Sequence, residues 1–383
     1  MNTIAPLSCA CAAAIMAALS APGLAAPPRH PVGLGAVLTS ADGSQIFGFD
    51  IDQNGNDGVL ATATSVETFD QDTGKIVTSI VTKNPAVNSY SVDGIFTGDA
   101  GLVTHYITPK GQIYARRVYA LMNPVTGNKF TGAWTPPLHD IDVQLTAENQ
   151  TTSTSALFAI ELKNNDAPDL IISNVAQNTF GKIVKLDPNF FSLGNGPQLS
   201  QYTAGNQAVM AESPDYGAVG GQAPLNFLFD MTTGKSTSFA GYNNGPFHAG
   251  YVNGLATDPN TGISATDTEL NAQVELYDMA KQAGITAVQL PCTHDADQTY
   301  SGSGISVDPV NKLFLVTETY NACTNGSGSA IVVFDETGKY IETISGFAFA
   351  IGEPGPVLNP SKRMGWAFAG PGENFAQLQQ FFY

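Results

Sequence analysis

Residues Ile331–Ile344, IVVFDETGKYIETI, read as a β-strand, a tight turn and a second β-strand. The flanks are rich in β-branched residues, and Asp335–Lys339 supplies the turn, where Gly338 can adopt a positive φ. A hairpin of this length cannot bury its own apolar face, whereas stacked hairpins can. The turn recurs as FDQDTGK from Phe69 and FDMTTGK from Phe229, and more loosely as LMNPVTGNKF from Leu121 and LYDMAKQAG from Leu276.

A second turn type precedes the first within each repeat. It is an Asp-Pro turn, in GLATDPNTGISATDT from Gly254 and in GISVDPVNKLFLVTET from Gly304. The spacing of the two turns predicts a unit of four antiparallel strands joined in sequence. Six such units can be traced, at 45–82, 90–134, 141–191, 198–240, 251–290 and 302–344.

The end of the chain offers three more strands, GPVLNP, MGWAFAGP and FAQLQQFFY. We expect Gly35–Ser40, near the N-terminus, to add the fourth, so that both termini build a seventh unit and leave no free edge. Four-stranded units with a period of about 40–50 residues are typical of a β-propeller. The predicted fold is therefore all-β, a single β-propeller of seven four-stranded blades. Six blades is the alternative if the last strands do not close the ring, and a pair of β-sandwiches would not explain the repeated turns.

The Phe-Asp-x-x-Thr-Gly-Lys and Asp-Pro-x-x-Gly turns resemble the repeats of YVTN/NHL-type β-propellers. The resemblance covers most of the chain after the first 26 residues. It implies the propeller fold and no particular chemistry, because such repeats carry many functions.

The first 26 residues resemble a secretory signal peptide. The apolar run CACAAAIMAALSA is followed by Gly23 and Ala25, the small residues that signal peptidase requires. We therefore expect a signal peptide at 1–26, a propeller domain at 27–383, and a secreted or periplasmic protein. No other stretch is long and apolar enough to span a membrane.

The net charge of −17 excludes the nucleic-acid-binding classes, because an acidic surface repels polyanions. It is compatible with neutral ligands, divalent cations or cationic partners, and solubility is the other explanation for it. We expect a monomer with an unidentified ligand or protein partner. Cys9 and Cys11 fall in the signal peptide. Cys292 and Cys323 are then the only cysteines of the exported chain, which predicts one disulfide between neighbouring loops.

The clearest ligand-binding motif is the segment from Asp50 to Gly58, DIDQNGNDG. Oxygen-bearing side chains at alternate positions before Gly55 match a calcium-binding loop. The segment also resembles the calcium loops of FG-GAP propeller blades, although Gly58 and Ala61 occupy positions where a loop of this kind carries acidic ligands. A turn without metal is the other interpretation. A structural calcium ion is the only cofactor expected, with ligands from Asp50, Asp52, Asn54, Asn56 and Asp57.

A second candidate is Asn253 in YVNGLATDP, which resembles the Asn-Gly-Leu strand of the regucalcin/gluconolactonase propellers. In that family this Asn ligates a catalytic divalent metal, so the resemblance implies a metal ligand at Asn253. The other ligands of that family have no match in this chain. An Asn that caps an inner strand is therefore the other interpretation.

Two loops that lead into inner strands carry the most reactive residues. In a propeller such loops gather at one mouth of the central channel, here from the fifth and sixth blades. Candidate binding residues are Phe247, His248, Asn253, His294 and Asp297, and candidate catalytic residues are His248, His294 and Asp295. We expect a non-catalytic exported binding or scaffold protein that uses this mouth. The alternative is a metal-assisted lactone hydrolase or lyase of the regucalcin/gluconolactonase type.

Overall fold

The computed structural model of the 383-residue chain separates a unit at Pro31–Tyr383 from Met1–His30. The residues that the structure describes belong, apart from His30, to the first of these units. They are 30–62, 64–81, 87–93, 101–107, 116–122, 141–150, 152–161, 167–174, 177, 179–186, 195–202, 207–213, 225–240, 252–268, 273–290, 304–321, 328–347, 355–369 and 376–383.

The described residues form seven antiparallel sheets, which we number as blades in chain order. In the first three blades the strands follow one another from the inside outwards. Blade 1 holds β2 (Ile46–Ile51), β3 (Asp57–Thr62), β4 (Ser65–Asp70) and β5 (Lys75–Val81); blade 2 holds β6 (Val87–Asp93), β7 (Gly101–Ile107) and β8 (Arg116–Met122); blade 3 holds β9 (Ile141–Asn149), β10 (Thr154–Glu161), β11 (Ala167–Asn174) and β12 (Thr179–Lys185).

The next three blades repeat the same order of strands. Blade 4 holds β13 (Asn195–Tyr202), β14 (Gln207–Ser213), β15 (Leu225–Asp230) and β16 (Ser236–Ala240); blade 5 holds β17 (Val252–Thr257), β18 (Ile263–Thr268), β19 (Gln273–Asp278) and β20 (Ala283–Gln289); blade 6 holds β21 (Gly304–Asp308), β22 (Leu313–Asn321), β23 (Gly328–Asp335) and β24 (Tyr340–Ile344).

Blade 7 joins the two ends of the chain. It holds β25 (Val357–Asn359), β26 (Met364–Ala369), β27 (Gln377–Phe382) and, outermost, β1 (Gly33–Thr39). Strand β1 pairs antiparallel with β27, with Leu34 opposite Phe381 and Leu38 opposite Leu378. The predicted closure by both termini is therefore confirmed.

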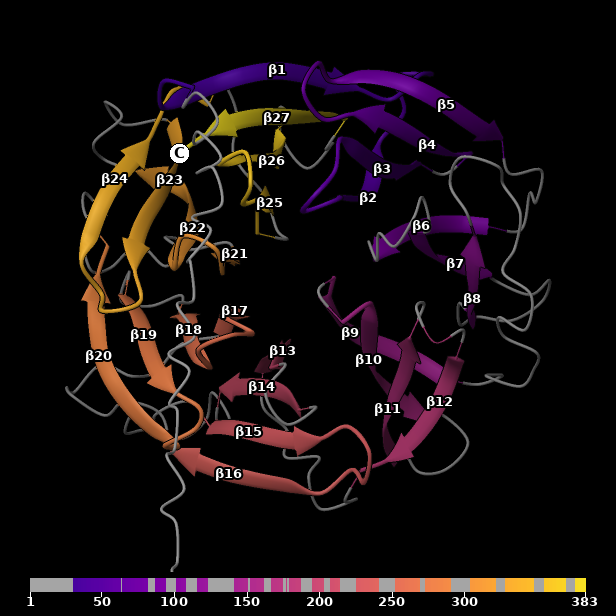
Figure 1. Cartoon of the computed structure of the whole chain (residues 1–383). Coiled ribbons are helices and arrows are strands. Elements are labelled where there is room, and N and C mark those ends of the chain that lie inside the picture. The colour runs from indigo at the N-terminus through magenta and orange to yellow at the C-terminus, as the bar shows by residue number, and fades with distance from the viewer. Residues whose placement is uncertain are drawn as a thin grey trace, which may run out of the picture. The chain divides into compact units, whose positions relative to one another are not determined.

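The sheets are arranged in a ring around their innermost strands (Figure 1). Each inner strand contacts the next, in the circular order β2, β6, β9, β13, β17, β21, β25 and back to β2. The predicted all-β single propeller is confirmed. Six sheets have the expected four strands, and blade 2 has three within the described residues, since residues 123–140 after β8 lie outside them.

The hydrophobic core lies between the blades. One cluster joins blades 7 and 1, where the rings of Phe69 and Trp366 lie 5.4 Å apart and those of Phe49 and Phe368 lie 4.8 Å apart. Further clusters join blades 3 and 4, 4 and 5, 5 and 6, and 6 and 7. Because neighbouring blades cover both faces of a sheet, Ile331–Phe334 of β23 is buried without alternation.

The recurring turns owe their shape to an aspartate at the end of the third strand. The Asp335 carboxylate accepts hydrogen bonds from the backbone N–H groups of Thr337 (2.9 Å) and Lys339 (3.1 Å), and Gly338 has a φ of 84°. The turn after Asp230 is built in the same way. The Asp-Pro turns use the same carboxylate capping at Asp258 and Asp308, after the first strand of their blades.

Candidate functional site

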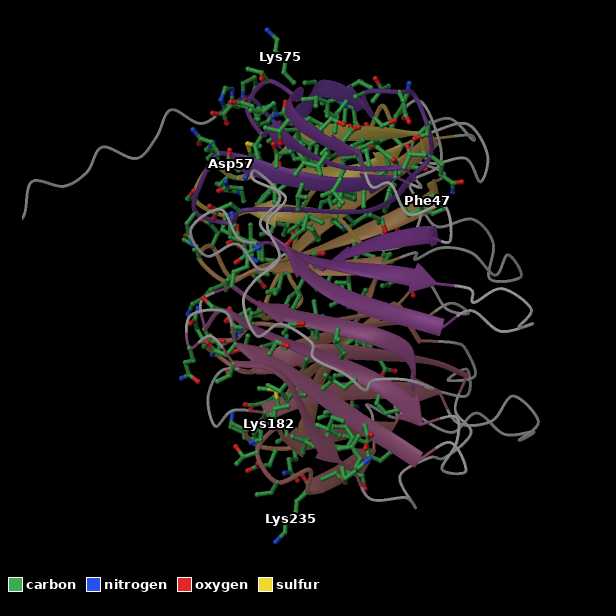
Figure 2. All side chains as sticks on the ribbon, turned by 90° about the vertical axis from the view of Figure 1, so that its right-hand side faces the viewer. Phe47, Asp57, Lys75, Lys182 and Lys235 are labelled. Atoms are coloured by element: carbon green, nitrogen blue, oxygen red, sulfur yellow. The ribbon has the colours of Figure 1, made fainter. Side chains whose placement is uncertain are left out.

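The strand order gives the ring two different faces. The turns from first to second strand and from third to fourth strand lie on one side, which we call the turn face. All other connections join strand ends on the opposite side, the connector face. Figure 2 shows Phe47, near the start of β2, and Asp57, at the start of β3, on opposite sides.

The two faces differ in the length of their connections. On the turn face, β4 ends at Asp70 and β5 begins at Lys75, and β23 and β24 are joined as closely. On the connector face β3 and β4 are also joined closely, between Thr62 and Ser65, but several other connections are much longer. The longest of these connections between described strands run from Ser213 to Leu225, from Ala240 to Val252, from Gln289 to Gly304 and from Ile344 to Val357.

Most of the predicted site residues belong to these connections. Phe247 and His248 fall between β16 and β17, and Cys292, His294, Asp295 and Asp297 fall between β20 and β21, while Cys323 falls between β22 and β23. All of them lie outside the described residues. The strand ends that the three connections join are on the connector face, so the predicted grouping and the predicted disulfide stay predictions.

Asn253 lies on the inner strand β17, near the connector face. The pairing register of β17 with β18 shifts between Val252 and Gly254, so Asn253 is the extra residue of a β-bulge. Bulges re-aim side chains and are frequent beside binding sites. The same register shift occurs at Phe47 in β2 and at Asn88 in β6, so the bulge is a repeated feature of the inner strands. The proposed role of Asn253 as a metal ligand stays a prediction.

The inner strands of blades 5, 6 and 7 approach one another closely at this end of the ring. A Cβ atom on Gly254 of β17 would lie 2.8 Å from the backbone nitrogen of Ile305, and a Cβ atom on Gly355, before β25, would lie at the same distance from that atom. The start of β21 is therefore packed between two glycine backbones. The Ser306 hydroxyl also donates to the carbonyl oxygen of Pro356. The connections that leave these strand ends start from a rigid base.

The predicted calcium loop forms the turn between β2 and β3 on the turn face. Its backbone oxygens accept amide protons: the Gln71 side chain donates to Asp52 (2.9 Å) and Asp57 (2.7 Å), and the Asn359 side chain donates to Asp52 (3.2 Å) and Gly55 (3.0 Å). These bonds tie the loop to its own blade and to blade 7.

The side-chain oxygens of this loop also have protein donors. One Asp52 oxygen accepts from the backbone of Asn54 (2.8 Å), and the Asn56 oxygen accepts from the Lys362 ammonium group (2.6 Å). Asp50 is buried in β2, where Gln150 of blade 3 donates to it at 3.3 Å. Within the described ranges no three His, Cys, Asp or Glu side chains gather as a metal cluster. The calcium ion stays a prediction.

A repeated contact between blades on the turn face was not predicted from the sequence. The residue that follows the third strand reaches back to the Asp or Asn that ends the first strand of the preceding blade. The Asn359 side chain donates to Gln71 Oε1 at 3.0 Å, and the Tyr383 hydroxyl donates to Asp308 Oδ2 at 3.0 Å. We call these contacts the blade latches.

The latch between blades 5 and 6 joins two carboxyl groups, those of Asp258 and Glu336. Burial and the neighbouring Asp258 raise the pKa of Glu336 to about 7, although the Thr261 hydroxyl that donates to it at 2.6 Å acts in the opposite direction. The only trace of this contact in the sequence is the residue directly after the turn aspartate. It differs between blades, as Gln71, Met231, Met279 and Glu336, whereas the aspartate before it is the same.

None of the described residues forms a helix that is long and apolar enough to cross a membrane. No protein-family model and no curated protein matches this chain. The propeller is thus assigned from the arrangement of the strands, and the YVTN/NHL resemblance rests on the repeated turns alone.

Proposed function

We propose that this chain is an exported, non-catalytic β-propeller that binds a ligand or partner on the connector face, at the channel mouth of blades 5 and 6. The observation that supports this most directly is the unequal length of the connections on the two faces. Long connections on a rigid scaffold are where binding residues are usually found.

The turn face is a poor candidate for ligand binding. Its turns are short, and their aspartates are engaged by backbone N–H groups of the same turn. The amide side chains of Gln71 and Asn359 are used between blades. Groups that are already bonded within the protein gain little from a ligand.

The glycine packing of β17 against β21 supports the choice of blades 5 and 6. A rigid base keeps binding residues in a fixed geometry, which lowers the entropic cost of binding. The predicted Cys292–Cys323 disulfide adds to this rigidity. The acidic composition favours a neutral or cationic ligand over an anionic one.

A lactone hydrolase or lyase is the second candidate. Its support is the place of Asn253 on the inner strand β17, in the Asn-Gly-Leu segment that resembles the metal-ligand strand of the regucalcin/gluconolactonase family. This function requires carboxylates from the connector face to join Asn253 around a divalent ion.

Thermal-shift measurements with defined probes test the proposal. The probes are neutral oligosaccharides, cationic peptides and calcium or zinc salts, applied to wild type, to His248→Ala/His294→Ala and to Lys235→Ala, an exposed residue at a turn (Figure 2). We expect a probe that raises the melting temperature of wild type and of Lys235→Ala, and has no effect on the double variant.

Two results contradict the proposal. One is a probe that stabilises the double variant as much as wild type, which places the site elsewhere. The other is metal-dependent hydrolysis of a sugar-acid lactone that Asn253→Ala abolishes, which replaces the first function by the second. The same protein can be titrated with a thiol reagent without reduction, and two reactive thiols exclude the disulfide.

We also propose that the loop Asp50–Gly58 binds a structural calcium ion with low affinity. The spacing of its side-chain oxygens supports the site, whereas the Lys362 ammonium group, which donates to Asn56 Oδ1 at 2.6 Å, competes with a cation there. Calorimetry with calcium on wild type and on Asp52→Ala tests it. Equal heat from both proteins, or none, excludes the ion.

A further inference from the structure

The blade latches occupy equivalent positions, because the strand registers are equivalent. Asp57 lies opposite Asp70 in blade 1, Leu313 lies opposite Asp335 in blade 6, and Met364 lies opposite Phe382 in blade 7. The next residues along the third strands are therefore equivalent too. They are Gln71, Glu336 and Tyr383.

In two of the three latches a hydrogen-bond donor is present at neutral pH. Asn359 supplies an amide group to Gln71, and Tyr383 supplies a hydroxyl group to Asp308. Burial and the Asp308 carboxylate raise the pKa of Tyr383 well above its usual value, so this hydroxyl keeps its proton. Neither contact depends on pH near neutrality.

The third latch has no such donor. Asp258 is completely buried, and its Oδ1 accepts from the backbone N–H groups of Asn260 (2.7 Å) and Thr261 (3.2 Å). Its Oδ2 receives no hydrogen bond from any donor in the described part of the chain. Thr261 places the Glu336 carboxyl group beside it, because the Thr261 backbone N–H donates to Asp258 Oδ1 and the Thr261 hydroxyl donates to Glu336 Oε1 at 2.6 Å. A hydrogen bond between the two carboxyl groups requires a proton on one of them.

We propose that Asp258 and Glu336 share one proton across the boundary of blades 5 and 6, and that this pair is a pH-sensitive latch on the turn face. With the proton, one carboxyl group donates to the other as Tyr383 donates to Asp308. Without it, two carboxylates face each other where one of them is buried, and the contact becomes repulsive. This inference does not depend on the proposed ligand.

The charged surroundings of Glu336 are limited. From blade 5 it faces Asp258, and from the first turn of blade 6 it faces Lys312, whose positive charge opposes the rise in pKa without cancelling it. Its own turn carries Asp335 and Lys339, and the Asp335 carboxylate is engaged by the N–H groups of that turn. Burial and Asp258 outweigh the opposing effects of Thr261 and Lys312 and raise the pKa of Glu336 to about 7.

The direction of the pH effect follows from the raised pKa. In the unfolded chain Glu336 releases its proton near 4.5, and in the folded protein it does so near 7. Between these values the folded state holds more protons, so stability falls as the pH rises through this window. Above it the loss is complete and the latch is open.

The Glu336→Gln variant tests the proposal, because Gln71 shows that glutamine fits the equivalent position in blade 1. Its amide group can donate to Asp258 at any pH. We expect the variant to melt roughly 2–6 °C above wild type at about pH 8 and at the same temperature at about pH 5. Glu342→Gln, on the following strand of the same hairpin, is the matched control and is expected to follow wild type at both pH values.

A second measurement does not require a variant to fold. A carbon-13 titration of the glutamate carboxyl groups in wild type should show one residue with a midpoint near 7, which Glu336→Gln removes. A titration midpoint near the ordinary glutamate value overturns the proposal. So do melting temperatures of wild type and Glu336→Gln that change with pH in parallel. The proposal is also overturned if calcium raises the melting temperature of wild type, but not that of Glu336→Gln, at about pH 8. A cation would then occupy the place that the proposal gives to the proton.

Discussion

At the scale of single residues, Gly234 reports how closely neighbouring blades approach. It lies in the turn between β15 and β16 with a φ of 73°, and a Cβ atom there would lie 2.1 Å from the carbonyl oxygen of Lys185 in blade 3. A backbone atom cannot move aside as a flexible side chain can. Gly234 is therefore constrained by its conformation and by its neighbour.

We predict that Gly234→Ala lowers the free energy of unfolding by about 2–4 kcal/mol, from left-handed strain and overpacking together. Gly43→Ala is the matched control, because Gly43 has a φ of 72° and open space around its Cβ position. It should cost about 1 kcal/mol. Urea denaturation of both variants measures the difference, and equal losses would show that the blades can separate at this point.

At the scale of elements, the turn aspartates determine how the outer hairpins respond to acid. The backbone N–H groups of Thr233 and Thr232 donate to Asp230 at 2.8 Å and lower its pKa. A lowered pKa stabilises the fold when the group is ionised, and this contribution is lost as the pH falls through the folded-state pKa.

We predict that Asp230→Ala costs about 1 kcal/mol at neutral pH and less at about pH 2.5. Asp230→Asn is the control, because Asn359 and Asn174 cap turns of this protein with their side-chain oxygens. It should cost less than the alanine variant and show no added pH dependence. Denaturation curves at the two pH values check this. If Asp230→Ala lowers the free energy of unfolding equally at both pH values, the carboxylate charge contributes nothing to the stability of the turn.

These turns also explain why so much of the fold could be predicted. Their capping is local, so Asp335 and Gly338 carry the signal within five residues of sequence. The hairpin at Leu276 was predicted in the same way, although Gln282 rather than glycine takes the positive φ after Asp278. The strands of blade 7 were predicted from the three strand-like runs at the end of the chain. Repetition of a local signal indicated the blades and their order.

The candidate site was less predictable for a physical reason. The contact between Asp258 and Glu336 joins turns of different blades, and nothing in the local sequence of either turn indicates the other. The calcium motif shows the reverse problem. Asn54 and Asn56 have the expected spacing, but Lys362, which donates to the Asn56 side-chain oxygen, comes from elsewhere in the chain. The grouping of His248 and His294 stays a prediction.

At the scale of the whole molecule, the ring depends on the pairing of its two ends. Trp366 is completely buried between blades 7 and 1, together with Leu38 from β1 and Leu378 from β27. The Gln380 side chain accepts a hydrogen bond from Ala36 (2.9 Å) and donates one to the Gln71 carbonyl oxygen (2.7 Å). Blade 7 therefore has no complete core without both termini.

We predict that a chain beginning at Pro31 folds with cooperative unfolding, because it keeps β1. A chain beginning at Ala41 lacks β1 and should lose several kcal/mol, with exposure of Trp366. A chain that ends before Gln377 should lose as much. Tryptophan fluorescence in a Trp134→Phe background follows the change, and native-like emission from the chain that begins at Ala41 would show that the ring closes without β1.

The closure also dictates the order of events during synthesis. Ala36 is made before its partner Gln380, which lies 344 positions later in the chain. At about 5–20 residues per second, β1 waits on the order of tens of seconds for β27. During that interval Leu38, and the face of blade 1 that packs against blade 7, have no partner. Newly made chains are thus vulnerable to aggregation until β27 has been made, and a holding chaperone that binds β1 and blade 1 would protect them until then.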